Sequence, residues 1–446
     1  MSWVEKASVL GSKQSALQHD WNISETQVDQ LVKHYKSRLI KEANLENITT
    51  LTPIDRKRKI ERLVKQMIDE EKVIITSDQM EQIIQQIINE SVGYGPLESL
   101  LRDESITEIM VNGPYEVFIE RQGKLEKSNV RFKDNEHVRH IIDRIIAPLG
   151  RRIDESSPMV DARLMDGSRV NAVIPPISVD GPSISIRKFK KDPYSLEDLM
   201  KFGSFSEDMA EFLKAAVKAK ANILVSGGTG SGKTTLLNVL SDSIPQGERI
   251  VTIEDMAELR LTYDNLVRLE GRPSNMEGKG EVTIRHLVKN ALRMRPDRII
   301  VGEVRGSEAI DMLQAMNTGH EGSLTTIHAN SPKDALGRLE SMVIMSGLPL
   351  TVEVIRGYFV GALDLIVQTS RFSDGKRRIV NIAELVEENG VIFAKDIFRF
   401  NRKATLPDGT ILGEFEGTGY VPNIYQRFIS YGIDFSKHIL EAGALK

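Results

Sequence analysis

The chain contains three kinds of hydrophobic pattern, one after another. At 1–90 a polar start gives way to apolar positions recurring every three or four residues, which predicts amphipathic helices. The three stripes are Val28-Leu31-Val32-Tyr35-Leu39, Ile60-Leu63-Val64-Met67-Ile68 and Met80-Ile83-Ile84-Ile87-Ile88. We expect a flexible tail and a small helical bundle, with Asp78 as N-cap of the third helix. Such a bundle suits a docking module and a packing scaffold equally well.

From Gly93 the pattern changes to short runs in which apolar and polar positions alternate, as in half-buried strands. The expected strands, separated by Asn-Gly, Gln-Gly and Asp-Gly turns, are 106–112, 117–121, 130–132, 159–164, 169–174 and 183–189. One amphipathic helix at 138–149 interrupts them. We therefore predict an α+β N-terminal domain at 91–190, followed by a hinge at Lys190-Lys191-Asp192-Pro193.

In the third region helices alternate with short buried strands, which predicts an α/β domain with a mainly parallel sheet over 191–446. Ser195 and Asp198 form the pattern of a capping box at its start. The expected strands are 249–254, 298–304 and 323–328, and the expected helices are 206–218, 283–294, 307–317 and 331–347. Asp374-Gly375 and Asn389-Gly390 turns then predict a three-stranded meander. Beyond residue 400 we expect a C-terminal extension without a motif.

Composition narrows the class of protein. A chain of 446 residues exceeds one hydrophobic core, so two or three domains are expected. The net charge of −4 gives no overall attraction to nucleic acid, and the lack of cysteine excludes disulfides and cysteine-bound zinc. No apolar run approaches the roughly 18 residues of a membrane span, and the start lacks a signal-peptide pattern. We expect a cytoplasmic protein that reaches the membrane through partners.

A glycine-rich turn stands between an apolar run and an amphipathic stretch, which is the strand–loop–helix context of a phosphate-binding loop. Its residues are Gly227, Gly228, Thr229, Gly230, Ser231, Gly232, Lys233, Thr234 and Thr235. Backbone N–H groups of such a loop surround a polyphosphate, and the following helix adds the positive end of its dipole. We expect Lys233 to reach the β- and γ-phosphates of ATP and Thr234 to bind Mg²⁺. The alternative is a flexible turn that matches by chance.

Carboxylates follow two later strands, at the sheet edge where such folds bind ligands. Glu254, Asp255 and Glu258 come after the first and could organise Mg²⁺ or its water shell, unless they form only a solvated strand end. After the second strand stands Gly302-Glu303, where a P-loop enzyme usually carries an aspartate. Glu303 is our candidate for the carboxylate that polarises the attacking water.

Two histidines bracket the strand 323–328. His328 is at the carboxyl end, where it could bind or sense the γ-phosphate, and His320 lies before the strand. A buried histidine is more often structural, so a structural role stays the alternative for both, and the more so for His320.

Together these motifs resemble the type II/type IV secretion-superfamily ATPases, and most closely the CpaF-type motor of tight-adherence (Tad) pili. The resemblance covers about residues 90 to 400. The segments that carry it are Gly-Tyr-Gly-Pro-Leu (93–97), Ile-Met-Val-Asn-Gly (109–113), Gly-Arg-Arg-Ile-Asp-Glu-Ser-Ser-Pro (150–158), Asp-Ala-Arg-Leu (161–164), Asp-Gly-Ser-Arg-Val-Asn (166–171), Ala-Leu-Arg-Met-Arg-Pro-Asp-Arg (291–298) and Ala-Met-Asn-Thr-Gly-His (315–320).

The resemblance implies roles for these residues. Lys233 and Thr234 match the Walker A residues, Glu254 to Glu258 the Asp box, Gly302-Glu303 an atypical Walker B motif and His328 the His box. It also implies a RecA-like motor domain, a homohexameric ring and nucleotide bound beside the N-terminal domain. In the family, arginines of the N-terminal domain close over the phosphates. The matching positions in this sequence are Arg187 and Arg169. The alternative for both is that they belong to a solvated charged loop.

The implied partners are membrane platform proteins of a pilus or secretion machine and, through them, pilins. The expected location is the cytoplasm, peripheral to the inner membrane. The missing four-cysteine zinc insert of many pilus-assembly ATPases favours the Tad-like branch. Two rivals stay open: a nucleic-acid translocase ring, against which the absence of a basic, aromatic-rich stripe counts, and a nucleotide-gated adaptor without turnover, against which Glu303 counts. Pilus extension and retraction are both compatible with the sequence.

Overall fold

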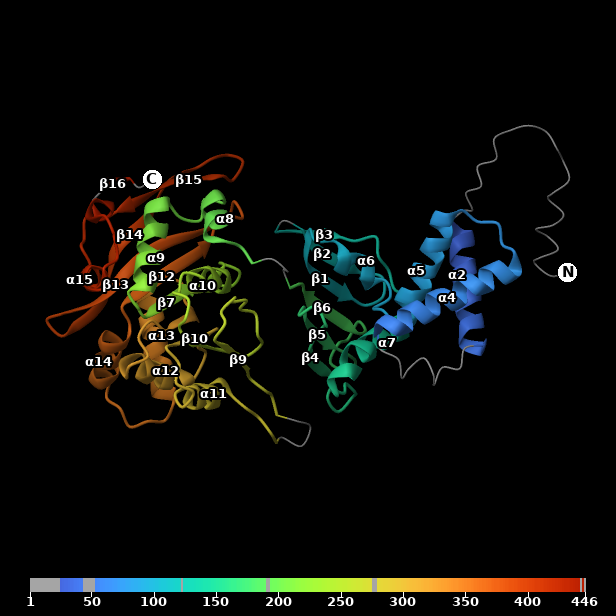
Figure 1. The fold of residues 1–446 in the computed structure, drawn as a ribbon, viewed down its shortest axis with the longest axis horizontal. Helices are drawn as coiled ribbons and strands as arrows, with labels where there is room; N and C mark the ends of the chain where they lie inside the picture. The colour runs from blue at the N-terminus through green and yellow to red at the C-terminus, as the bar shows by residue number, and fades with distance from the viewer. Residues whose placement is uncertain are drawn as a thin grey trace. The chain divides into compact units, whose positions relative to one another are not determined.

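The computed structural model describes residues 25–42, 53–121, 123–189, 193–274, 279–441 and 443–444. The chain divides into two compact units, Met1–Lys190 and Lys191–Lys446, and each is described by itself (Figure 1). The expected hinge at 190–193 falls mostly on residues outside the described ranges, so it stays a prediction. The same holds for the tail at the N-terminus.

The first unit begins with the three predicted helices, α2 (Glu25–Glu42), α4 (Pro53–Glu71) and α5 (Ser77–Ser91). Each turns its apolar stripe inward, and Tyr35 is fully buried with its hydroxyl donating to Glu71 at 3.1 Å. The prediction of Asp78 as N-cap was wrong. Thr76 caps α5, because its hydroxyl accepts from the Gln79 backbone N–H while the Gln79 side chain accepts from the Thr76 backbone.

The same unit contains an antiparallel six-stranded sheet in the order β3-β2-β1-β6-β5-β4. Its strands are β1 (Ile106–Asn112), β2 (Val117–Arg121), β3 (Lys124–Lys127), β4 (Met159–Arg163), β5 (Arg169–Val173) and β6 (Ser183–Arg187). The helices are α6 (Leu97–Arg102), α7 (Asn135–Ile146) and the 3₁₀ turn η2 (Ala147–Leu149). The apolar face of α7 packs in one core with the strands.

One predicted strand of this sheet was wrong. Residues 130–132 are not a strand; Phe132 is buried in the core cluster instead. The third strand of the hairpin is β3, whose four side chains are all exposed. An exposed edge strand leaves no alternation of apolar and polar positions, so periodicity could not reveal it.

The second unit is built on a ten-stranded sheet in the order β16-β15-β14-β13-β12-β7-β11-β10-β8-β9. Its strands are β7 (Ile223–Gly227), β8 (Ile250–Glu254), β9 (Leu266–Glu270), β10 (Arg298–Val301), β11 (Leu324–His328), β12 (Leu365–Arg371), β13 (Arg377–Glu388), β14 (Val391–Thr405), β15 (Ile411–Gly417) and β16 (Gly443–Ala444). Neighbours from β9 to β12 pair in parallel, whereas those from β12 to β16 pair antiparallel. The α/β class and the predicted meander are confirmed, and the parallel part of the sheet ends at β12.

Helices cover both faces of this sheet (Figure 1). One core contains side chains of α8 (Leu196–Lys201), α9 (Glu207–Lys218), α10 (Lys233–Ser241) and α15 (Ile424–Ser430), with the short η3 (Lys437–Leu440). The other contains α11 (Ile284–Ala291), α12 (Glu308–Asn317), α13 (Pro332–Met345) and α14 (Val352–Ala362). The capping box of Ser195 and Asp198 is confirmed at α8. Sequence patterns missed α14, β9 and the C-terminal elements.

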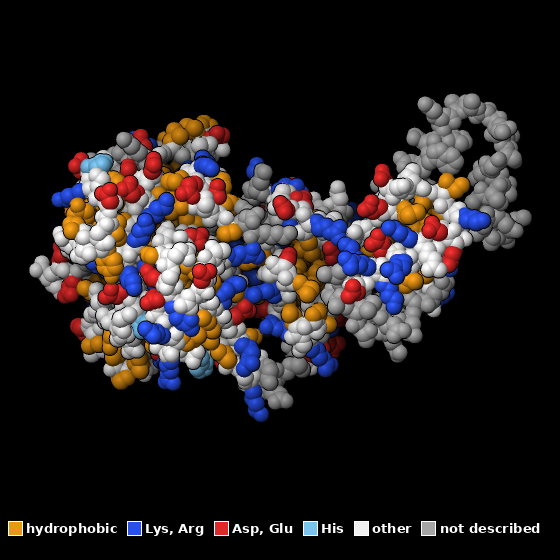
Figure 2. All heavy atoms as spheres, in the orientation of Figure 1, with side chains coloured by type: hydrophobic (Ala, Val, Ile, Leu, Met, Phe, Trp, Pro, Cys, Tyr) orange, Lys and Arg blue, Asp and Glu red, His pale blue; other side chains and the backbone are white. Residues whose placement is uncertain are grey.

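On the face of the second unit shown in Figure 2, acidic and basic side chains are interspersed. Among the described helices, none combines the length and apolar character that a bilayer crossing requires.

The parallel part of the large sheet determines where a ligand can be bound. Parallel pairing brings the carboxyl ends of β7, β8, β10 and β11 to one edge of the sheet. Open α/β sheets bind their ligands at this edge, because the loops that carry polar side chains leave the strands there.

Candidate nucleotide site

The glycine-rich turn joins β7 to α10, and two of its glycines have a backbone conformation that glycine adopts more readily than other residues. Gly230 and Gly232 have φ values of 70° and 96°, a left-handed conformation that disfavours other residues. At Gly227 a methyl group would come within 2.4 Å of both Ser231 Oγ and Thr369 Oγ1. The loop is therefore closed against β12 by small residues, and Ser231 and Thr369 join the two segments through a 2.9 Å hydrogen bond.

Lys233 is the first residue of α10 and is only 7% exposed. Its Nζ donates to the Gly228 carbonyl at 3.0 Å and lies 3.3 Å from both ring nitrogens of His328. Thr234 and Thr235 follow in the first helical turn, where backbone N–H groups have no helical acceptor. A lysine, these N–H groups and the helix dipole thus converge on the mouth of the loop.

Glu303 follows β10 and contacts two basic groups. Its Oε1 lies 3.1 Å from His328 Nε2, and its Oε2 accepts from Arg305 Nη2 at 2.8 Å. His328 ends the neighbouring strand β11, so adjacent parallel strands bring the two residues together. A continuous series of polar contacts therefore runs from the phosphate loop through Lys233 and His328 to Glu303.

Burial and positive neighbours both act on the His328 imidazole. Desolvation lowers its pKa from the ordinary value, and the charge of Lys233 lowers the pKa further, while Glu303 acts in the opposite direction. His328 is accordingly neutral at pH 7, with one ring nitrogen able to donate and the other to accept.

Glu254 ends β8 and is 4% exposed. Its Oε1 accepts from the backbone N–H groups of Glu258 and Leu259 at 2.8 and 3.0 Å. Its Oε2 is buried and finds no hydrogen-bond partner among the described residues. Burial raises the pKa of this carboxyl. An orphaned carboxylate oxygen at the site is one that a ligand or its water can satisfy.

Gly302 explains why the usual aspartate is missing from this strand end. A methyl group on Gly302 would come within 2.9 Å of Glu254 Cγ. Any side chain there would displace Glu254, and the Gly302 carbonyl meanwhile accepts from Thr326 Oγ1 at 2.7 Å. The acidic residue nearest this strand end is the next one along the chain, Glu303.

The other acidic candidates differ in position. The Asp255 side chain is 55% exposed and lies 3.8 Å from Arg305 Nη1, and Glu258 contacts Glu254 through its backbone. No group of three or more His, Asp or Glu side chains in the described ranges could hold a metal ion alone. A divalent cation would need phosphate oxygens and Thr234 as further ligands, a donor set that suits Mg²⁺.

His320 is not brought to this edge. It lies before the first residue of β11, at the strand end opposite His328, and its carbonyl accepts from Ser323 Oγ at 2.8 Å. That placement agrees with the structural alternative considered for it.

The two candidate arginines of the first unit lie on neighbouring strands. Arg169 begins β5 and Arg187 ends β6, and the strands pair them directly opposite each other. Arg163 of β4 is opposite Arg169, so three arginines follow one line across the sheet. Arg187 Nε also lies 3.4 Å from Glu108 Oε1. Sequence reasoning missed Arg163, although the Asp166-Gly167 hairpin turn sets this register.

A glycine-rich loop between a parallel strand and a helix is the arrangement of a P-loop nucleotide-binding domain, and the acidic residue Glu303 follows another strand of the same parallel sheet. Comparison with known proteins then gives the family. The chain belongs to the family described as "Type II/IV secretion system protein", which matches residues 90–373.

Two relatives of known name agree with this membership, and the chain is also similar to one solved structure. A putative conjugal transfer protein of Mycobacterium tuberculosis is 38% identical over 319 residues, which cover 70% of this chain and 90% of the relative. The type IV secretion system protein VirB11 of Bartonella quintana is 33% identical over 351 residues, covering 68% and 96%. The crystal structure of the Brucella suis VirB11 ATPase, 33% identical, covers 65% of this chain and 95% of its own, with a TM-score of 0.37.

Proposed function

We propose that this protein is a motor that hydrolyses ATP and drives a type IV pilus or secretion machine of the Tad type. The observation that carries the proposal is the series of contacts from Lys233 through His328 to Glu303, which begins on the phosphate loop. Family membership supports the motor class, because relatives carry the names of secretion-system proteins. The Tad assignment rests on the family-like segments between residues 93 and 320 and on the absence of cysteine.

In this proposal the loop from Gly227 to Thr235 binds the triphosphate. Its backbone N–H groups and the helix dipole neutralise the β- and γ-phosphates. Lys233, which donates to the Gly228 carbonyl in the described structure, turns its ammonium to the γ-phosphate. The single N–H of neutral His328, which faces Glu303 before substrate arrives, turns to the same phosphate when ATP binds.

Glu303 acts as the general base. One carboxylate oxygen accepts a proton from the attacking water while the water oxygen bonds to the γ-phosphorus and the bridging oxygen leaves with ADP. Arg305 and His328 each contact one of the two Glu303 oxygens, so the carboxylate is oriented before substrate arrives. Orientation of this kind is what proximity catalysis requires.

Mg²⁺ fits the donor set. Thr234 would bind it directly, and Glu254, Asp255 and Glu258 would act through its water shell, with the orphaned Glu254 Oε2 as the strongest acceptor. The ion would supply charge neutralisation at the phosphates.

Arg187 and Arg169 complete the proposed site from the first unit. We infer that they bind the phosphates when the units close on ATP and withdraw after product release, which converts hydrolysis into a hinge motion. Six copies in a ring would transmit that motion to membrane platform proteins and, through them, to pilins, from the cytoplasmic face of the inner membrane.

The test combines a phosphate-release assay with a native mass measurement, with and without a non-hydrolysable ATP analogue. We expect Mg²⁺-dependent release and a six-chain species with the analogue. Binding without release would contradict the motor and support a gated adaptor. Turnover stimulated by DNA, with steep salt dependence, would instead support a nucleic-acid translocase.

A further inference from the structure

The hairpin of β12 and β13 reaches the phosphate loop from the side, and the proposed hydrolysis makes no use of it. Arg371 ends β12 and Arg377 begins β13, and the two pair directly opposite each other. Directly opposite side chains project from the same face of a two-stranded ladder. Two guanidinium groups are therefore held side by side, an arrangement that costs energy unless negative charge or carbonyl oxygens compensate it.

Both arginines lie close to the glycines of the loop, and Arg377 donates a hydrogen bond to one of them. Arg377 Nε donates to the Gly230 carbonyl at 2.9 Å, and its Cδ lies 3.4 Å from the position of a methyl group on Gly232. Arg371 Nη1 lies 3.6 Å from the corresponding position on Gly230. These two glycines have the left-handed backbone that shapes the loop, so Arg377 holds the part of the loop that determines where its N–H groups point.

The turn of the hairpin is rigidly anchored. Asp374 and Arg378 form an ion pair whose side chains are 6% and 7% exposed, with Nη2 and Oδ2 at 2.9 Å. The Arg378 guanidinium also lies over the rings of Phe372 and Phe400 at 5.0 and 5.3 Å. Asp374 further accepts from the backbone N–H groups of Lys376 and Ile411.

The anchored turn determines which charged groups lie near Arg371 and Arg377. The carboxylate of Asp374, the acidic residue of the turn, accepts hydrogen bonds from Arg378 and from the backbone N–H groups of Lys376 and Ile411. Two like charges that a fixed turn holds beside a phosphate loop raise the local positive potential, which favours an anion there.

We propose that Arg371 and Arg377 form a basic clamp that sets the affinity of the phosphate loop for nucleoside di- and triphosphates. Arg377 is a positioning residue that fixes the Gly230 peptide, and Arg371 places its guanidinium on the polyphosphate. This inference rests on the proposed binding of nucleotide at the loop. It adds a second source of positive charge within the motor unit itself, independent of Arg169 and Arg187.

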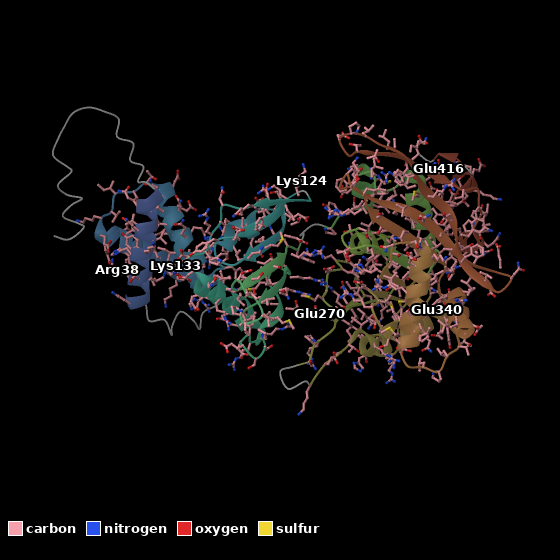
Figure 3. The ribbon with its side chains drawn as sticks, turned by 180° about the vertical axis from the view of Figure 1, so that it is seen from behind. Arg38, Lys124, Lys133, Glu270, Glu340 and Glu416 are labelled. Carbon is pink, nitrogen blue, oxygen red and sulfur yellow. The ribbon has the colours of Figure 1, made fainter. Side chains whose placement is uncertain are left out.

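The experiment measures the dissociation constant of a fluorescent ADP by titration, together with kcat and KM for ATP, in the full chain. The variants are Arg371→Ala, Arg377→Ala, the double variant and Arg377→Lys. The matched control is Arg399→Ala on β14, whose side chain pairs with Glu416, labelled in Figure 3, at the antiparallel end of the same sheet. Thermal unfolding checks that each variant folds.

We expect each single alanine variant to weaken ADP binding about tenfold, as for loss of one charge-assisted hydrogen bond. The double variant should lose more, KM should rise, and kcat at saturating ATP should change less than about threefold. Arg377→Lys should recover most of the affinity, because an ammonium can still donate to the Gly230 carbonyl. If Arg377 had only a structural role, its loss would change KM and kcat together.

The inference is overturned if the double alanine variant binds ADP within about twofold of the wild type. That result leaves the proposed ATPase intact, provided the wild type still binds and hydrolyses nucleotide. A wild type that binds no ADP overturns both proposals.

Discussion

The two units present their charged candidates in opposite ways. In the second unit Lys233 and Glu254 are 7% and 4% exposed and are held by hydrogen bonds to backbone groups or to neighbouring strands. In the first unit the Arg187 side chain is 59% exposed and stands in a line with two other arginines. The residues of the proposed phosphate site are buried and oriented, whereas Arg187 lies exposed at the end of β6.

The difference in burial between these charged residues indicates that the two units have different roles. Buried, oriented groups bind and activate without a rearrangement, which is the property that electrostatic catalysis needs. An exposed arginine such as Arg187, with its long side chain, suits a contact that forms and breaks in each cycle. We therefore expect substitutions in the second unit to abolish a step, and substitutions in the first unit to slow one.

The largest expected effect is that of Lys233→Ala. Loss of the ammonium removes charge stabilisation at the phosphates, so turnover should fall to roughly a thousandth, with ATP binding weakened as well. Phosphate release and fluorescent-nucleotide titration measure the two effects. Lys218→Ala, at the exposed end of α9, is the control. Hydrolysis at the wild-type rate would show that the loop is not the catalytic phosphate site.

Next in size is Arg187→Ala. If the arginine reaches the phosphates only when the units close, kcat should fall about 10- to 100-fold while ADP affinity changes little. Arg187→Lys should recover part of the rate. Arg121→Ala on β2, whose side chain pairs with Asp103 and Glu126, should behave as the wild type. An unchanged kcat in Arg187→Ala would leave the first unit without a catalytic role.

A smaller effect is expected from pH, through His328. Its lowered pKa keeps the ring neutral at pH 7, so kcat/KM should be flat from neutral pH upward. When the pH falls through that lowered pKa, the imidazolium forms an ion pair with Glu303, the proposed catalytic base, and competes with the water for this carboxylate, so kcat/KM should decline. His328→Asn should lack this acidic decline. An identical profile in the variant would assign the ionisation to another group.

The smallest effect is on stability. Gly302→Ala forces a methyl group against Glu254 Cγ, and we expect it to lower the free energy of unfolding by about 1–3 kcal/mol in denaturant titration. Gly337→Ala, in the interior of α13 with open space around its Cβ among the described residues, should instead stabilise by up to about 1 kcal/mol. Equal behaviour of the two variants would mean that Glu254 moves aside freely.

Much of the fold can be predicted from the sequence because its signals are local. The stripes of α2, α4 and α5 and the turn at Asp374-Gly375 each depend on residues close in the chain. The edge strand β3 was missed because all its side chains are exposed. The antiparallel half of the large sheet was only partly foreseen, since strand order depends on distant pairings that periodicity does not encode.

The residues of the candidate site can likewise be divided into those that sequence motifs reveal and those that they do not. The phosphate loop, Glu303 and His328 carry motif signals, and parallel strands explain why they meet. Arg371 and Arg377 carry none, because their proximity to Gly230 comes from a hairpin more than a hundred residues later in the chain. The requirement for glycine at position 302 could not be predicted from the sequence either, since it depends on where the Glu254 side chain lies.

The most direct test of the account is Glu303→Gln, assayed for ATP binding and phosphate release in the same sample. The amide keeps the shape of the side chain but cannot take a proton from water. We predict that ATP binding persists while phosphate release falls about 100-fold or more, with Glu388→Gln, an exposed glutamate of β13, at the wild-type rate. Phosphate release at the wild-type rate by Glu303→Gln would contradict the assignment of the catalytic base.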